Sequence, residues 1–429
     1  MRDSIQVGLL GCGTVGAALV RLVDEHADLI AGRAGVTIEI ARVGVRDLSR
    51  RRDVKLPPER FTTDVAAIVD DPAIDVVVEV IGGVEPARSL IMAALQAGKP
   101  VVTGNKELIA RHGPELFEVA AAAGVDLLFE ASVAGGIPLM RPLRESLAGD
   151  RIRRVTGIVN GTTNYILTRM TEEGSTFAAA LADAQALGYA EADPTADVEG
   201  YDAAAKAAII ATVAFGARVH LDDVHTEGIT GITDDDIASA RLLGYVVKLL
   251  AIAEAIDGDV AVRVHPAMVP VHHPLASVRD SFNAVLIEGE AVGELMLYGR
   301  GAGGGPSASA VLGDLIDAVR NLVAGGTVAT VSGLVDRPVR PIGDLESQFY
   351  LFMEVADRPG VLAAIAGEFG RHGVSIQSME QRGLGDDARL VFITHRAREA
   401  DLRATLDALR EVEPVHRVGS VIRVTGDVG

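Results

Sequence analysis

The sequence predicts an α/β protein of several domains, whose N-terminal third forms a doubly wound parallel sheet. Apolar segments of strand length alternate there with longer segments of helical pattern, which is typical of parallel sheets. A glycine-rich turn joins the first of these strands to the first helix. The chain has 429 residues, too many for one hydrophobic core, so two or three domains are expected.

The first strand and the first helix enclose a Gly-x-Gly-x-x-Gly motif. Residues 5–10 have the pattern of a buried strand, and residues 17–23 that of a helix. In this context the glycines let the backbone approach a pyrophosphate, and the helix N-terminus offers unpaired N–H groups to it. We therefore expect a nicotinamide dinucleotide at Gly11, Cys12, Gly13, Thr14, Val15 and Gly16. The alternative is a glycine turn without a ligand.

Further strands and helices complete this Rossmann-type pattern. Strands are expected at residues 37–43, 74–81, 100–103 and 125–129. The helical patterns between them include residues 86–97 and 114–123.

The end of the second strand bears on the choice between NAD and NADP. An NAD site usually has a carboxylate there, which binds the ribose 2′-OH. This chain has Arg46 just after the strand, followed by Asp47 and by a basic run at residues 50–55. A guanidinium suits a 2′-phosphate, so we favour NADP, with NAD tolerated. We interpret the basic run as a solvated charged loop.

Composition and charge exclude several classes of function. A net charge of −19 argues against nucleic acid or an anionic membrane as the main partner. The longest uncharged apolar run, residues 207–217, is too short to span a bilayer. The only cysteine, Cys12, excludes an internal disulfide framework and a cysteine-based zinc site. The first residues run directly into a strand, so we expect no secretory segment and a cytoplasmic protein.

An acid-rich segment at residues 188–206 is the strongest indication of chemistry. Five carboxylates precede Lys206, which opens a strongly apolar run. Asp202 and Lys206 are four residues apart, so on a helix they share one face. A lysine held by acids at the start of a buried helix is typical of an active site. A solvated acidic loop explains the spacing equally well.

A nicotinamide site implies hydride transfer, so a side chain must handle a proton at the substrate oxygen. Cys12 lies inside the phosphate loop and cannot form a thiohemiacetal, and a zinc ligand set is absent. The spacing Tyr-x-x-x-Lys does not occur at residues 201–206 or 245–248. His265, His272 and His273 stand beside prolines and are expected to be loop structure. Lysine remains, as Lys206 or as Lys106, which follows the strand at 100–103.

The pattern restarts after a glycine pair at 325–326 and a proline-rich stretch at 336–343. Strands are expected at 349–355, 374–379, 390–394 and 418–424, with helices at 359–371 and 402–409. This βαββαβ order is that of a ferredoxin-like domain. The turn DRPGVL at 357–362 resembles the ACT domain, a regulatory module that pairs with its copies and binds amino acids between them.

With these motifs assembled, the chain resembles homoserine dehydrogenases that carry a C-terminal ACT domain. The resemblance runs from end to end. The motifs that carry it are the glycine loop, the segment 188–206, TGNK at 103–106, FEASVAGGIP at 129–138, NGTTNYIL at 160–167 and GRGAGGGP at 299–306.

The resemblance implies NAD(P)-dependent interconversion of L-aspartate 4-semialdehyde and L-homoserine, on the route to threonine, methionine and isoleucine. Lys206 would donate the proton to the aldehyde oxygen, and Lys106 would assist and contact the cofactor. Residues Glu191, Asp197, Asp202 and Tyr189 would bind the substrate. The further cofactor contacts would be Thr103, Gly188 and Gly303. A sodium-type site would be formed by Glu130, Val133, Gly135 and Ile137, for which a structural turn is the alternative.

These motifs also predict the division of the chain. Residues 1–149 with about 305–325 form the NAD(P)-binding domain, and 150–304 an α+β domain for catalysis and dimerisation. Residues 326–347 form a linker, and 348–429 the ACT domain. A homodimer or homotetramer is expected, with threonine as the candidate effector. The alternatives are a non-catalytic sensor of NADP and amino acids, and a dehydrogenase of another amino-acid semialdehyde.

Overall fold

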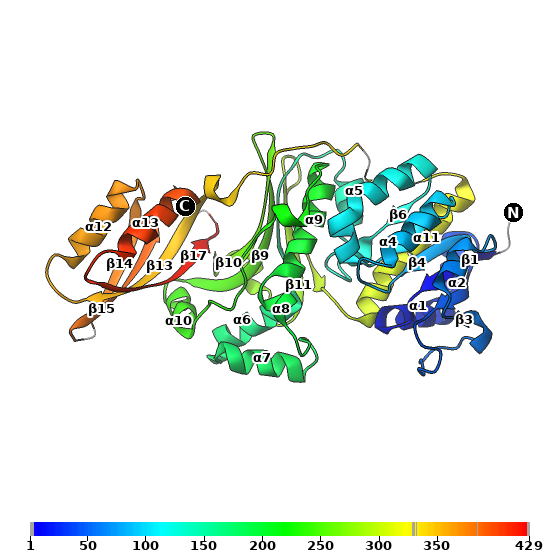
Figure 1. The fold of residues 1–429 in the computed structure, drawn as a ribbon, viewed down its shortest axis with the longest axis horizontal. Coiled ribbons are helices and arrows are strands. Elements are labelled where there is room, and N and C mark those ends of the chain that lie inside the picture. Colours follow the sequence, from blue (N-terminus) through cyan, green and yellow to red (C-terminus); the bar gives the residue numbers. More distant parts are fainter. Residues whose placement is uncertain (1–3, 328–330, 332, 384, 427–429) are drawn as a thin grey trace.

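The computed structural model describes residues 4–327, 331, 333–383 and 385–426. The molecule is elongated, with the N-terminal sheet at one end and the C-terminal unit at the other (Figure 1). A central unit lies between them. No helix in the described residues is long and apolar enough to cross a membrane.

The N-terminal unit is a six-stranded parallel sheet in the order β3-β2-β1-β4-β5-β6. Its strands are β1 (Ser4–Leu10), β2 (Thr37–Gly44), β3 (Phe61–Thr62), β4 (Val76–Glu79), β5 (Val101–Thr103) and β6 (Leu127–Leu128). Its helices are α1 (Thr14–Glu25), α2 (Ala27–Ala34), α3 (Val65–Asp70), α4 (Ala87–Gln96) and α5 (Lys106–Ala123). The strand order reverses beside β1, which confirms the predicted doubly wound sheet and places a ligand-binding crevice there.

Helix α11 (Gly304–Ala324) returns from the central unit to this sheet. In Figure 1 the yellow helix lies among the blue and cyan elements. It packs against α1, and Ala308, Val311 and Leu315 share one hydrophobic core with Val7 and Leu9. The chain therefore crosses between these two units more than once.

The central unit is built on strands of an eleven-stranded sheet in the order β12-β11-β7-β9-β10-β17-β13-β15-β14. Its own strands are β7 (Ile152–Ile158), β8 (His225–Thr226), β9 (Tyr245–Ile256), β10 (Asp259–Pro270), β11 (Phe282–Gly289) and β12 (Gly293–Arg300). Its helices are α6 (Gly161–Glu173), α7 (Phe177–Ala186), α8 (Thr195–Val198), α9 (Tyr201–Phe215) and α10 (Asp234–Leu242). The short helical turns of the whole chain are η1 (Pro58–Arg60), η2 (Glu130–Ser132), η3 (Pro142–Ser146), η4 (Leu221–Asp223), η5 (Pro274–Ser277) and η6 (Ile342–Asp344), as far as the structure describes it.

Helix α9 is apolar on almost every side and packs against β9, β10 and α5. It starts after Gly200 and ends before Gly216, and both glycines have left-handed backbone angles. A helix at the protein surface has one apolar face and one polar face, whereas a helix that is apolar all round is buried. The sequence of α9 therefore explains its burial between the sheet and the N-terminal unit.

The C-terminal unit contains β13 (Glu346–Ala356), α12 (Val361–Arg371), β14 (Ile376–Gly383), β15 (Asp387–Thr394), β16 (Ala397–Arg398), α13 (Glu399–Arg410) and β17 (Val415–Val424). This order confirms the predicted βαββαβ pattern, with the short β16 added. Strand β17 pairs in parallel with β10, at Ala267 with Arg423 and at Met268 with Val424. The C-terminal unit thereby extends the central sheet.

One expectation about this framework needs correction. The helix expected at residues 114–123 begins at Lys106 instead, and Pro114 lies inside it. The reason is that the Asn105 side chain accepts the Leu108 N–H and starts the helix ahead of the proline. The predicted linker, 326–347, includes residues 328–330 and 332, which lie outside the described residues. Its described part runs along the central unit, where Val335 bridges to Ala217 and Val339 to Val260.

Candidate active site

The carboxyl ends of the parallel strands gather several of the predicted cofactor residues. Glu79 ends β4 and Thr103 ends β5, and both are fully buried. The Thr103 hydroxyl donates to Glu79 Oε2 at 2.6 Å, while Glu79 Oε1 accepts the N–H groups of Ile81 and Gly82. These bonds fix the turns at the edge where a dinucleotide binds in such sheets.

The glycine loop leaves room for a ligand at one position and packs tightly at the other two. Gly11 has φ +103°, and a Cβ there would lie 2.8 Å from Val80 O. A Cβ on Gly16 would lie only 2.1 Å from Gly11 O. A Cβ on Gly13, by contrast, would have no atom within 4 Å. Because Gly13 precedes helix α1 and its N–H groups, the loop fits a pyrophosphate.

The glycine run after β12 lies against this loop. A Cβ on Gly304 would be 3.0 Å from the Thr14 side chain, so the two backbones approach closely. Gly303 has φ +126°, a conformation that favours glycine. The structure thus brings Gly304, the neighbour of Gly303, to the glycine loop.

The two predicted lysines meet on one carboxylate. Lys206 lies on α9 and donates from Nζ to Asp202 Oδ2 at 2.6 Å and to Val159 O at 2.7 Å. Lys106 opens α5 in the N-terminal unit, and its Nζ lies 2.7 Å from Asp202 Oδ1. The side chains of Asp202 and Lys206 are 8% and 11% exposed, whereas that of Lys106 is 46% exposed. Asp202 therefore bridges one buried and one accessible ammonium group.

This bridge shifts the pKa values of Asp202 and Lys106. Burial alone would raise the pKa of Asp202, but the ammonium groups of Lys206 and Lys106 outweigh it and hold that pKa well below its usual range. Burial likewise opposes the charge of Lys106, yet Asp202 raises the pKa of Lys106 above its ordinary value. Both lysines are thus presented to a ligand beside a firmly ionised carboxylate.

The acid-rich segment divides between this cluster and the surface. Asp197 and Asp202 both accept a hydrogen bond from the amide of Asn160, at 2.7 and 2.9 Å. Asp193 instead accepts the N–H of Thr195 in a turn, and Glu199 accepts the Thr230 hydroxyl. Sequence reasoning gave Asn160 no role, because nothing local indicates which residues its amide reaches.

The remaining predicted substrate residues form no bond with the cluster in the described part of the chain. The Glu191 carboxylate is exposed and forms no hydrogen bond or ion pair with a described residue. Gly188 has φ +76° in the same turn. The Tyr189 ring is 43% exposed and lies 5.1 Å from the Tyr165 ring, centroid to centroid. Glu191 is therefore free to meet a ligand, whereas both Asp202 oxygens are already occupied by lysines.

The predicted cation site is a tight turn beside Gly301. A Cβ on Gly135 would lie 2.2 Å from Gly301 O, and Val133 and Ile137 are buried. The Glu130 carboxylate is engaged within the protein, because it accepts N–H groups from Leu139, Met140 and Arg141. The described residues contain no group of three or more His, Cys, Asp or Glu side chains placed to hold a metal. Any cation here would have to rely on main-chain carbonyl oxygens.

Two arginines stand at the end of β2, on the cofactor side of the sheet. Arg46 is exposed, as expected for a group that binds a phosphate from solution. Arg52 differs from the expected solvated loop. Its guanidinium donates to the main-chain oxygens of Arg50 and Asp47 and stacks on the Phe61 ring, 5.7 Å from its centroid. The charge of Arg52 also lowers the pKa of the Cys12 thiol, but burial raises that pKa by more. The aromatic contact with Phe61, on the short strand β3, could not be inferred from charge alone.

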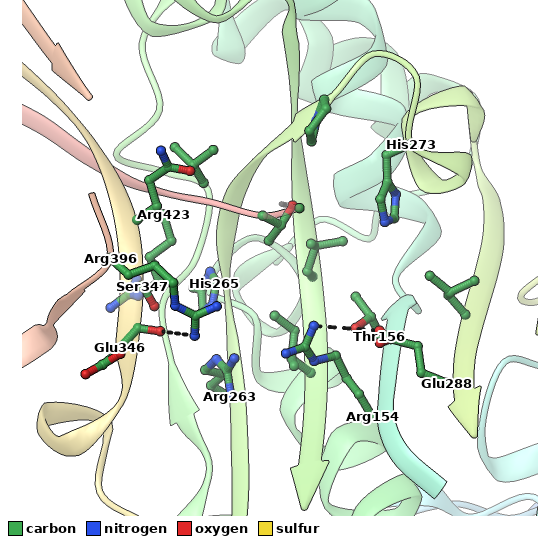
Figure 2. Close-up of a pocket in the computed structure, with 18 of the residues that line it drawn as sticks. Arg154, Thr156, Arg263, His265, His273, Glu288, Glu346, Ser347, Arg396 and Arg423 are labelled. Carbon is green, nitrogen blue, oxygen red and sulfur yellow. Dashed lines mark hydrogen bonds and ion pairs between the residues drawn. The ribbon is translucent and has the colours of Figure 1, made fainter. Parts of the chain in front are cut away.

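A cavity of about 560 Å³ lies away from these lysines, between the central sheet and the C-terminal unit. Figure 2 shows Arg423 and Arg396 on one wall and Arg154 and Glu288 on the other. None of the predicted site residues lines it. His265, expected in a loop, lies on β10 in its wall and is fully buried, whereas His272 and His273 do lie in a loop.

Charges in this cavity are largely compensated inside the protein. Glu254 pairs with Arg154 at 2.6 Å and with Arg263 at 3.1 Å across neighbouring strands. Arg423 pairs with Glu399 at 2.5 Å and with Glu227 at 2.7 Å. The pair of Arg423 with Glu227 joins β17 of the C-terminal unit to the central unit.

The second asparagine of the NGTTN motif has a separate, structural role. The Asn164 amide donates to the main-chain oxygens of Asp280 and Phe282, and its Oδ1 accepts Lys248 Nζ at 2.9 Å. Lys248 also donates to Val278 O at 2.5 Å. Burial lowers the pKa of Lys248 to about 8.

This lysine gives a prediction about pH and stability. The folded pKa of about 8 lies below the ordinary value of about 10.4, so between them the unfolded chain binds more protons. Stability should therefore rise with pH through this window, by at most about 1.4 kcal/mol per pH unit. Urea unfolding from pH 7 to 10 should show this gain in the wild type relative to Lys248→Met. Lys55→Met, at an 86% exposed lysine, is the control. A difference between wild type and Lys248→Met that stays constant with pH would contradict the prediction.

Comparison with known proteins agrees with the geometry. The chain matches three family models: "Homoserine dehydrogenase, NAD binding domain" at residues 11–130, "Homoserine dehydrogenase" at 138–316 and "ACT domain" at 349–414. It is 51% identical over 433 residues to a homoserine dehydrogenase of Mycobacterium tuberculosis, with 98% of each chain covered. The structure of a homoserine dehydrogenase from Thiobacillus denitrificans superposes with a TM-score of 0.93 at 40% identity, over 98% of both chains. A hyperthermophilic archaeal homoserine dehydrogenase in complex with NADPH is similar over 73% of this chain and 97% of its own, with a TM-score of 0.62 at 29% identity.

Proposed function

Because the chain belongs to the homoserine dehydrogenase family, we propose that it interconverts L-aspartate 4-semialdehyde and L-homoserine with Lys206 as the acid. The protein is an NAD(P)-dependent oxidoreductase of amino-acid biosynthesis with a C-terminal ACT domain. The observation that carries the role of Lys206 is its position with Lys106 on the buried Asp202, beside the edge of a nucleotide-binding sheet.

Lys206 is suited to protonate the substrate oxygen during reduction. The bound nicotinamide supplies the hydride. As the aldehyde oxygen gains negative charge, a fixed ammonium can stabilise it and transfer a proton to it. Asp202 and Val159 O each take one hydrogen of Lys206 Nζ, so the third remains for the substrate. Lys106 adds a second positive charge from the cofactor side.

The substrate's own ammonium group requires a carboxylate close to these lysines. Glu191 supports this role because it is exposed and free of partners among the described residues. Asp197 is half-buried and has one oxygen on Asn160. Asp202 contributes by holding the lysines, and Tyr189 and the Gly188 turn border the same place. In this assignment Glu191 binds the substrate ammonium group, and Asp202 holds the acid, Lys206.

NADP is the proposed cofactor, with NAD tolerated. The space at Gly13 and the close packing at Gly16 suit a pyrophosphate on the N-terminus of α1. Arg46, with Arg52 nearby, supports binding of the 2′-phosphate. Thr103, Lys106 and Gly303 would border the nicotinamide half at the sheet edge.

We also propose a sodium-type cation. The main-chain carbonyls of Val133, Gly135 and Ile137 would hold it, with Glu130 contributing its own carbonyl rather than its carboxylate. A hard monovalent cation suits such oxygen ligands. Its contribution would be to fix the turn on which Gly301 rests.

The ACT domain supports an amino-acid effector, with threonine as the first candidate. A homodimer or homotetramer fits a module that pairs with its copies. A non-catalytic sensor is not favoured, because the complete cluster of Lys106, Lys206 and Asp202 is in place.

Replacing the acid should lower turnover strongly while preserving cofactor binding. For Lys206→Met we expect kcat for reduction of aspartate semialdehyde to fall by about 10²- to 10⁴-fold. The KM for NADPH should stay unchanged. Lys99→Met is the matched control, because Lys99 binds the main-chain oxygens of Val69 and Asp71 just ahead of β5, at the opposite end of the sheet. Normal turnover by Lys206→Met would refute the assigned acid.

Removing the proposed phosphate contact should change cofactor preference. For Arg46→Ala we expect kcat/KM for NADPH to fall by about tenfold or more, because a charge-assisted hydrogen bond is lost. The value for NADH, which has no 2′-phosphate, should change little. Arg33→Ala is the control, since Arg33 lies in the last turn of α2, away from the end of β2. Equal losses with NADPH and NADH would contradict the role of Arg46.

A further inference from the structure

Asn160 is the last residue before helix α6 and is 5% exposed. Its Oδ1 accepts the Thr163 N–H at 2.9 Å and the Thr163 hydroxyl at 3.0 Å. Its Nδ2 donates to Asp197 Oδ1 at 2.7 Å and to Asp202 Oδ2 at 2.9 Å. All donors and acceptors of this amide are thus used, and its orientation is fixed by the helix on one side and two carboxylates on the other.

The two carboxylates present a problem that a neutral donor solves. Asp197 and Asp202 lie close enough to share one amide group, and like charges at that separation repel. A cation between them would compete with the lysines for Asp202. A carboxylate at position 160 would add a third negative charge. An asparagine supplies one N–H to each acid without changing the charge of the cluster.

The preceding residue strengthens this arrangement. Val159 O accepts a hydrogen bond from Lys206 Nζ at 2.7 Å. Two consecutive residues of the β7–α6 turn therefore hold the pair, because Val159 contacts Lys206 and Asn160 contacts Asp202. Asp202 Oδ2 accepts from both Asn160 and Lys206. A rotation of the Asp202 carboxylate would break both bonds at once, and with them the contact with Lys106 on Oδ1.

We propose that Asn160 is a positioning residue of the reaction, which orients Asp202 under Lys206 and directs Asp197 toward the substrate. This proposal rests on the role of Lys206 as the acid. Asn160 would act through other side chains, because its own amide has no free donor or acceptor for a ligand. A misplaced proton donor can cost about 10²-fold in rate, so the effect should be measurable.

The competing explanation is that Asn160 only caps helix α6. Serine and aspartate are also good caps, so Asn160→Ser and Asn160→Asp both keep an oxygen for the Thr163 N–H. Serine cannot donate to both acids, and aspartate replaces the donors with a third carboxylate. The two variants therefore separate the cap from the donation to the acids.

Asn164→Ser is the matched control. Asn164 lies one turn further along the same helix and binds the loop at 278–282 and Lys248, with no bond to either acid. We expect it to lower Tm and to leave the pH profile of kcat unchanged.

The test measures kcat, KM for each substrate, the pH profile of reduction, NADPH binding by fluorescence, and Tm. For Asn160→Ser we expect kcat to fall by about 10- to 100-fold with unchanged NADPH binding and a Tm close to that of the wild type. For Asn160→Asp we expect a similar loss and a profile moved to higher pH, because added negative charge favours the protonated form of neighbouring groups.

Wild-type kcat and pH profile in both variants would overturn the proposal. A loss of activity that follows Tm, with no shift of the profile in Asn160→Asp, would assign Asn160 to the helix alone and also overturn it. Failure of both variants to fold would also assign Asn160 to the helix alone and overturn the proposal. An active Lys206→Met would instead refute the proposed function, so the two failures are distinguishable.

Discussion

The contact on which this structure depends is the bridge from Asp202 to two lysines. Removing the Lys206 ammonium and the Asp202 carboxylate from water is costly, and the cost is offset only where the geometry pairs them well. Here each Asp202 oxygen takes one lysine, at 2.6 Å for Lys206 and 2.7 Å for Lys106. The chain has only five lysines, so the convergence of two on one acid is a specific feature of the fold.

The bridge also joins two domains whose tasks must coincide in space. The N-terminal sheet belongs to the domain that matches an NAD-binding family model, and the central unit carries Lys206, the proposed acid. Lys106 begins α5 at the edge of β5, whereas Asp202 and Lys206 lie one turn apart on α9. Helix α11 ties the units together a second time, by returning to pack on α1. In the proposed reaction, hydride and proton would therefore reach one substrate from two separate parts of the chain.

Local pattern predicts much of this architecture, and long-range contacts account for the rest. The parallel sheet, the βαββαβ unit and the shared face of Asp202 and Lys206 follow from periodicity and spacing. The contact of Lys106 with Asp202 does not, because it joins residues from different domains. Asn160 is unpredictable for the same reason: an asparagine before a helix indicates a cap, and its two bonds to distant acids leave no local signal.

The predicted cation turn and the basic run at residues 50–55 are two further places where local sequence does not predict side-chain contacts. Glu130 reads as a ligand from its motif, yet the following turn directs three N–H groups onto its carboxylate. Arg52 reads as a solvated charge, yet Phe61 packs beneath it. In both cases the backbone path, rather than residue type, decides what the side chain contacts.

The most direct test of the bridge is the pKa of Lys106, measured by NMR of reductively ¹³C-methylated lysines in the wild type and in Asp202→Asn. The small number of lysines makes assignment by substitution practical. If Asp202 holds the two ammonium groups, Lys106 should titrate above its ordinary value of about 10.4 in the wild type and clearly lower in the variant. An identical pKa in both proteins would contradict the bridge.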